Sequence, residues 1–140
     1  MTTVRIFPHS RDEFETDDEL RSWLHNGLRL RDGEYYLRAT KGIGSIPRGS
    51  IVLFRFDKDI VGEAIVKEDV QKVDIIRKGV KYEGMIKFEA SSIRIYRRPI
   101  KIKFLENITG RDFSVARTYF KIEWDVYRQI LAEVVKYGFF

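Results

Sequence analysis

The spacing of hydrophobic residues changes twice along the chain and predicts a helix, then many strands, then a helix. Near residues 16–27, apolar residues recur at helical spacing, and these are Leu20, Trp23, Leu24 and Leu28. Thr16 followed three residues later by Glu19 is a capping-box pattern, and the acidic residues around it suit a helix N-terminus. Gly27 is the expected end of this helix.

From Glu34 onward, apolar and polar residues alternate, which is typical of strands. These predicted strands cover residues 35–40, 51–56, 60–66, 82–96, 100–104 and 115–122. One more short strand, at residues 4–7, is predicted before the helix. The segment 82–96 is one bent strand or two, with the break at 90–92, and residues 70–79 fit either a strand or a connector. The glycines and proline of residues 41–49 predict a loop.

The C-terminal segment is helical, because Val126, Ile130 and Val134 share one face and Gly138 can end the helix. Strands and helices do not alternate as they do in a parallel sheet. The sequence therefore predicts an α+β fold, a mixed β-barrel flanked by helices. We expect one domain over residues 1–140, in which residues 1–33 form an N-terminal helical extension.

Composition narrows the function classes. The 140 residues include no cysteine, which excludes disulfides, thiolate zinc sites, iron–sulfur clusters and cysteine nucleophiles. No apolar run approaches the roughly 18 residues of a membrane span, so we expect a cytoplasmic protein without a membrane partner.

The formal charge is +5, and residues 1–34 carry eight acidic and five basic side chains. The remainder is strongly basic, which favours a polyanionic partner.

We find no catalytic or metal-binding pattern in the sequence. Only two histidines are present, His9 and His25, and no group of ligands has metal-binding spacing. No Asp or Glu stands two residues before a lysine, as a metal-dependent nuclease motif of that type requires. We therefore expect a non-catalytic protein with no cofactor and no metal.

Two predicted strands interleave cations with aromatic residues on one side. One side carries Arg94, Tyr96 and Arg98, and the other strand carries Arg117, Tyr119 and Lys121. Cations of this kind contact phosphates, and aromatic rings stack on exposed bases. A solvated outer sheet face covered by long side chains explains the pattern equally well. Lys41 and Arg48 lie in the loop between two strands, a common place for binding residues.

Several short segments resemble PUA-like domains of the EVE and YTH groups. Residues 35–41 (Tyr-Tyr-Leu-Arg-Ala-Thr-Lys) resemble their first strand, and residues 49–54 with 60–68 resemble the EVE hairpin in order and spacing. Residues 99–102 and 114–117, followed by Glu123-Trp124 at the start of the last helix, continue the resemblance. It covers about residues 35–131.

The resemblance implies a PUA-like β-barrel that binds DNA or RNA and holds one base, often a modified one, in a pocket. Such modules also occur at the front of McrBC-type restriction proteins, which implies fusion to or association with a catalytic or motor domain. By position, Thr40, Lys41 and Gly42 would line the pocket, and Arg117 would match the arginine before the last helix. Thr40-Lys41-Gly42 replaces the Ser-Glu-Pro common in EVE domains, and Trp23 and Trp124 are expected in the core rather than in a cage.

Two alternatives remain open at this point. An ASCH-like enzyme acting on nucleosides or RNA would need a constellation such as Lys41 with Glu63 or Glu89. A protein-interaction domain of a larger assembly would show a large exposed apolar patch, and the apolar residues 137–140 keep that alternative open.

Overall fold

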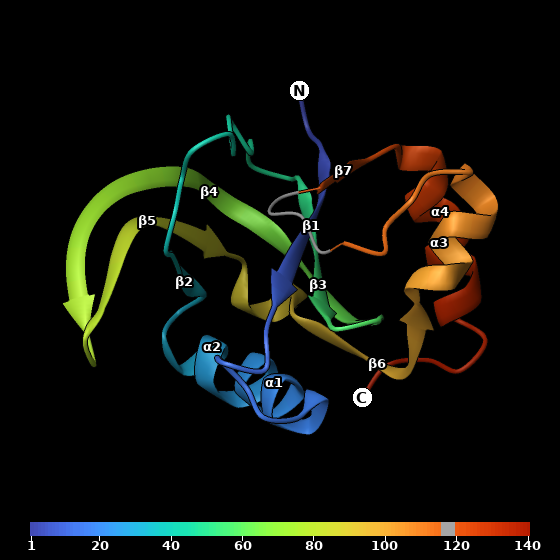
Figure 1. The fold of residues 1–140 in the computed structure, drawn as a ribbon, viewed down its shortest axis with the longest axis horizontal. Helices are drawn as coiled ribbons and strands as arrows, with labels where there is room; N and C mark the ends of the chain where they lie inside the picture. Colours follow the sequence, from blue (N-terminus) through green and yellow to red (C-terminus); the bar gives the residue numbers. More distant parts are fainter. Residues whose placement is uncertain (116–119) are drawn as a thin grey trace.

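The computed structural model describes residues 1–115 and 120–140. Its strands are β1 (Val4–His9), β2 (Glu34–Leu37), β3 (Ile51–Phe56), β4 (Asp59–Arg77), β5 (Val80–Phe88), β6 (Arg94–Lys101) and β7 (Phe120–Ile122). Its helical segments are α1 (Asp17–Ser22), a π-helical turn (Trp23–Gly27), α2 (Leu28–Leu30), a 3-10 turn (Ala90–Ser92), α3 (Ile102–Thr109) and α4 (Trp124–Val134). The fold is α+β, as predicted (Figure 1).

The strands form one mixed sheet of seven in the order β2-β5-β4-β3-β1-β7, with β6 paired to β4. β1 and β3 are parallel, and the other pairs are antiparallel. Within the described part of the chain, β2 and β7 at the two ends do not pair with each other, so the sheet is open. This corrects the expected barrel, which would have no ends.

β4 is the strand that organises the sheet. Its first part pairs with β3 and β6, and the part from Val66 to Arg77 pairs with β5. Three shifts of register in the β4–β5 pairing accompany the pronounced curl of this hairpin seen in Figure 1. Residues 70–79, which fitted either a strand or a connector, therefore continue β4 and then turn at Lys78 and Gly79.

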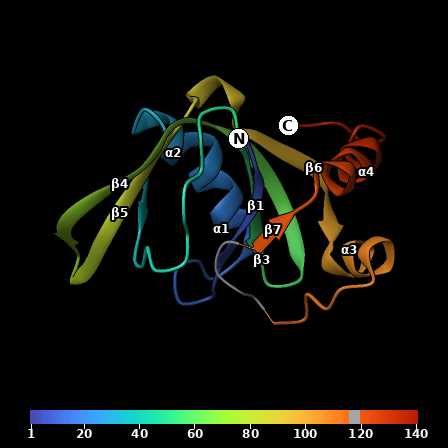
Figure 2. The ribbon, with the colours of Figure 1, turned by 90° about the horizontal axis from the view of Figure 1, so that it is seen from above.

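Helices cover the sheet on two sides (Figure 2). Leu20, Leu24 and Leu28 pack into one core cluster with the inner residues of β2, β3 and β5. A second cluster joins β1, β3 and β6 to α3 and α4 through residues such as Leu105 and Ile130. Residues 1–33 thus contain an inner strand of the sheet and a helix that covers one core cluster. That these residues are an extension of the domain stays a prediction from the sequence.

Two predicted elements end differently from expectation. The N-terminal helix does not stop at Gly27 but continues to Leu30, because the chain closes a π-helical turn in which the Leu28 N–H reaches the carbonyl of Trp23. The strand expected over 100–104 ends at Lys101 and becomes α3. The buried pair Ile102 and Leu105 at i, i+3 spacing gives α3 its apolar face, which alternation alone obscured.

Other boundaries were predicted well. The break at 90–92 is a 3-10 turn between β5 and β6, and α4 begins at Trp124. The hydroxyl of Thr16 accepts a hydrogen bond from the N–H of Glu19 at 3.2 Å, as expected for the helix start. The strand predicted over 115–122 is described only at Phe120–Ile122. No helix in the described ranges is both long and apolar enough to cross a membrane.

Candidate nucleic-acid interface

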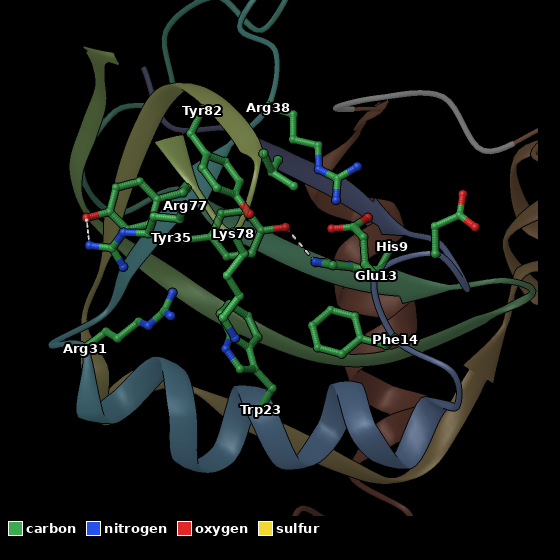
Figure 3. Close-up of a pocket in the computed structure, with 13 residues that line it drawn as sticks. His9, Glu13, Phe14, Trp23, Arg31, Tyr35, Arg38, Arg77, Lys78 and Tyr82 are labelled. Carbon is green, nitrogen blue, oxygen red and sulfur yellow. Dashed lines mark hydrogen bonds between the residues drawn. The ribbon is translucent and has the colours of Figure 1, made fainter. Parts of the chain in front are cut away.

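An aromatic cavity of about 420 Å³ lies between the N-terminal helical segment and the curled β4–β5 hairpin. This volume lies within the roughly 300–1,000 Å³ typical of small-molecule sites. Five aromatic residues line this aromatic pocket: Phe14, Trp23, Tyr35, Tyr36 and Tyr82. Four cations and two carboxylates also line it, and these are Arg31, Arg38, Arg77 and Lys78, with Asp12 and Glu13. Figure 3 shows Trp23 rising from the helix toward the strands, with Phe14 beside it.

The rings on the helix side of the pocket support one another. The ring centroids of Phe14 and Trp23 are 5.7 Å apart, and those of Trp23 and Tyr35 are 5.9 Å apart in an edge-to-face arrangement. Tyr35 is buried and contacts Phe54 and Phe88 of the core behind it. Trp23 is only half-buried, which differs from its expected place in the core. Its indole is therefore held by packing while part of it still faces the cavity.

The hairpin side of the pocket combines a cation with two tyrosines. The guanidinium of Arg77 lies 4.6 Å from the ring centre of Tyr36 and donates a 3.3 Å hydrogen bond to its hydroxyl. The rings of Tyr36 and Tyr82 are 5.7 Å apart. This cation–π contact ties the tip of the hairpin to β2 and places positive charge at the mouth of the pocket.

A histidine and a tyrosine form the polar floor of the pocket. His9 Nδ1 lies 3.2 Å from the backbone oxygen of Arg55, so Nδ1 carries the hydrogen and donates it. Nε2 then accepts a hydrogen bond from the hydroxyl of Tyr35 at 2.6 Å (Figure 3). Burial lowers the pKa of His9, and the nearby charge of Glu13 opposes this only in part. The imidazole is therefore neutral at pH 7.

None of the described residues predicted to bind nucleic acid lines this pocket. Thr40, Lys41 and Gly42 lie in the loop after β2. Arg38, directly after β2, lines the pocket, but these three residues do not. Arg48 is exposed at the far end of the same loop, and Lys121 is exposed on β7. Arg117 and Tyr119 lie outside the described residues. The roles of these residues stay predictions.

One carboxylate helps to hold the loop that carries Lys41 and Arg48. Asp69 on β4 accepts hydrogen bonds from the Ser45 hydroxyl at 2.6 Å and the Ile46 N–H at 2.7 Å. Partial burial would raise the pKa of Asp69, but these bonds and one from the Val70 N–H outweigh it and lower the pKa. The loop is therefore anchored along β4, beside the sheet rather than over the pocket.

The basic strand β6 faces the C-terminal rings. Arg94 lies over Phe139 and Arg98 over Tyr137, at 5.2 and 4.6 Å from the ring centres. Tyr96, between them, is fully buried, and its hydroxyl donates to Glu63 at 2.9 Å. This corrects the expectation that Tyr96 offers a stacking face: a β-bridge to Phe139 and the second core enclose its ring.

The constellation considered for an enzyme is not assembled either. The carboxylate of Glu63 is buried, and it accepts hydrogen bonds from both Tyr96 and Tyr127. Burial raises the pKa of Tyr96, and the charge of Glu63 raises it further. Lys41 and Glu89 are exposed, so they cannot share this enclosed site. Among the described residues, no group of three or more His, Asp and Glu side chains could hold a metal ion.

No protein-family model matches the chain, and no curated protein matches it in sequence. Solved structures do match. The fold is shared with an ASCH protein and a YTH domain. This agrees with the PUA-like fold that the sequence resemblance implies. An association with McrBC-type proteins stays a prediction.

The first of these structures is a Tyr-to-Phe mutant of the ZmASCH protein from Zymomonas mobilis. It has a TM-score of 0.60 and 7% identity over 93% of this chain and 97% of that chain. The second is the YTH domain of the Zygosaccharomyces rouxii MRB1 protein in complex with N6-methyladenosine RNA. It has a TM-score of 0.56 and 14% identity over 100% of this chain and 94% of that chain. At these identities the likeness concerns the fold alone.

The aromatic pocket was missed by the sequence reasoning because its lining comes from segments far apart in the chain. The pairs Tyr35-Tyr36 and Arg77-Lys78 are the local signals that could have drawn attention to it. Nothing in the sequence pattern shows that the β4–β5 hairpin curls toward the helix, and the pocket exists only because it does.

Proposed function

We propose that this protein is a non-catalytic nucleic-acid-binding module that takes one base of a single strand into the aromatic pocket. The observation that supports this most is the combination of half-buried rings from two sides with cations at the mouth. Rings bind the flat face of a base, and guanidinium groups bind the phosphates beside it. DNA and RNA share this chemistry.

The modified base is the finer part of the proposal. A methyl group adds apolar surface without charge, and a pocket walled by Phe14, Trp23 and Tyr82 gains by burying it. The YTH domain of similar fold is in complex with N6-methyladenosine RNA, which makes that base the first to test. One methyl group buried in an apolar wall adds about 0.8 kcal/mol, or roughly a fourfold preference.

The experiment is a binding panel of short single strands, each with one central base that is unmodified or methylated, at one salt concentration. We expect Trp23→Ala or Tyr82→Ala to weaken binding by about 1–3 kcal/mol, as is usual for the loss of a stacking ring. Trp124→Phe, a change on α4, is the matched aromatic control and should bind as the unaltered protein does. Equal affinities for all four proteins would contradict the proposal.

An enzymatic role on the same fold is the second candidate, and the His9–Tyr35 pair favours it. A neutral imidazole 2.6 Å from a phenol is an arrangement that can transfer a proton. Incubation of the protein with a nucleoside panel and with RNA distinguishes the candidates. Turnover that His9→Gln abolishes would establish the enzyme, and unchanged substrates support the binding module.

A further inference from the structure

A second cavity of about 280 Å³ lies beyond His9, at the ends of β1 and β3. His9 lines both cavities, and the second is otherwise lined by Pro8, Ser10, Arg11, Arg55, Asp57 and Ser114. It contains two guanidinium groups, two serines and one carboxylate. We refer to it as the Arg55 cavity.

Arg55 is an unusual residue for the inside of a sheet. It is 3% exposed, and its Nε donates a 2.7 Å hydrogen bond to the backbone oxygen of Asp57. In the described part of the chain, no carboxylate lies within 4.0 Å of its guanidinium. A buried charge without an ionic partner is costly, so such a group calls for an explanation.

The surroundings of Arg55 favour an anion. Phe54 and Phe56 belong to the core that the N-terminal helix covers. Arg55, between them in the strand, borders the cavity instead. The carboxylate of Asp57 pairs with Arg11 at 3.7 Å, so this one carboxylate in the cavity lining faces two guanidinium groups. Burial lowers the pKa of Arg55, while Asp57 and Glu106 oppose this from farther away. The cavity thus retains net positive charge.

We infer that the Arg55 cavity is a binding site for a phosphate group. The Nε bond to Asp57 fixes the plane of the guanidinium, and the two Nη groups are the edge that binds two oxygens of a tetrahedral anion. The hydroxyls of Ser10 and Ser114 provide further donors. The phosphate comes either from solution or from the backbone of a strand held in the aromatic pocket, and only the second source rests on the proposed function.

The test for the first source is thermal unfolding of the full chain in inorganic phosphate, with acetate of equal ionic strength as the reference. At ten times Kd, phosphate should raise the Tm of the unaltered protein by about 3–6 °C. Arg55→Met keeps the volume and removes the charge. It should be at least as stable in acetate, because the unpaired buried charge is gone, and phosphate should add little to its Tm. The control Arg128→Ala, on the exposed face of α4, should respond to phosphate as the unaltered protein does.

Equal phosphate responses in Arg55→Met and the unaltered protein would overturn the site, because phosphate stabilises many proteins through the solvent alone. If Arg55→Met does not fold, NMR of the unaltered protein gives the same decision. A phosphate-dependent shift of the Arg55 Nε–H signal supports the site, and an unmoved signal overturns it.

The second source is tested with a trinucleotide. If its phosphate reaches the cavity, Arg55→Met should weaken trinucleotide binding about tenfold and leave nucleoside binding unchanged. If the trinucleotide does not bind but inorganic phosphate still does, the proposed function fails while the phosphate site stands. Unchanged trinucleotide affinity in Arg55→Met assigns the site to free phosphate.

Discussion

Gly27 lies so close to the indole of Trp23 that a β-carbon there would be 2.7 Å from Cδ1 of the ring. The two residues belong to the same π-helical turn, with Trp23 as its first residue and Gly27 as its last. Contacts that short do not occur between real side chains, so the indole occupies its place only because Gly27 has no side chain. The turn therefore sets the direction in which Trp23 enters the aromatic pocket.

Gly27→Ala should displace the indole and weaken binding of the preferred strand severalfold while the protein stays folded. Alanine favours a helix over glycine by up to about 1 kcal/mol, which offsets part of the clash. Circular dichroism, tryptophan emission and affinity should be measured together. Ser22→Ala, on the same helical segment, is the control and should leave emission and affinity unchanged. An unaltered affinity in Gly27→Ala would show that the position of Trp23 does not matter.

Acid should destabilise the protein through His9. Burial lowers the pKa of His9 in the folded state from 6.5, so the unfolded chain takes up the proton first as the pH falls. This contribution to the free energy of unfolding is complete above pH 6.5 and is lost progressively below it. Tm measured from pH 7.5 to 5.0 should fall less steeply in His9→Gln than in the unaltered protein.

The same Tm series also provides the contrary result. An equal slope of Tm against pH in His9→Gln and in the unaltered protein would show that the buried His9–Tyr35 pair does not cause the acid sensitivity.

Tyr96→Phe should lower stability without lowering affinity. The change removes one of the two hydroxyls that donate to the buried carboxylate of Glu63, which costs about 1–3 kcal/mol. Chemical unfolding and binding of the preferred strand should be measured at a temperature at which the variant is fully folded. A selective loss of affinity for a modified base would indicate that Tyr96 contacts the base, contrary to what its burial implies.

The cations at the mouth of the aromatic pocket should determine how binding depends on salt. Each phosphate contact to a single strand contributes roughly 0.7 to the slope of log affinity against log salt. Arg38→Gln should therefore flatten this slope by about that amount, and Lys121→Gln on β7 should not. A flattened slope only in Lys121→Gln would place the strand along β7, as the interleaved cations of the sequence suggested.

The sequence predicts the helices and strands of this protein better than it predicts how they pack against one another. Mostly apolar runs locate β3 and the first half of β4, because both strands bury most of their residues. Thr16 marks the helix start through a local hydrogen bond. Ile100, Ile102 and Phe104 alternate as a strand would, yet the chain turns into α3 after Lys101 because Ile102 and Leu105 together reach the second core.

The candidate site depends on contacts that no local pattern records. Alternation placed Arg94, Tyr96 and Arg98 on one face, but the pairing of Tyr96 with Phe139 buries the tyrosine and leaves the arginines outside. Trp23 has the spacing of a core residue, and only the open space between the helix and the β4–β5 hairpin makes it part of a pocket. Likewise, the burial of Arg55 follows from tertiary packing around a strand of ordinary appearance.

The fluorescence of Trp23 tests the central claim most directly. The chain has two tryptophans, so Trp124→Phe leaves Trp23 as the only indole. This variant should be titrated with a single strand that carries one N6-methyladenosine and with its unmethylated counterpart. We predict saturable quenching of Trp23 by both strands, at a severalfold lower concentration for the methylated one. Binding detected by another method without any change in Trp23 emission would contradict a base pocket at this position.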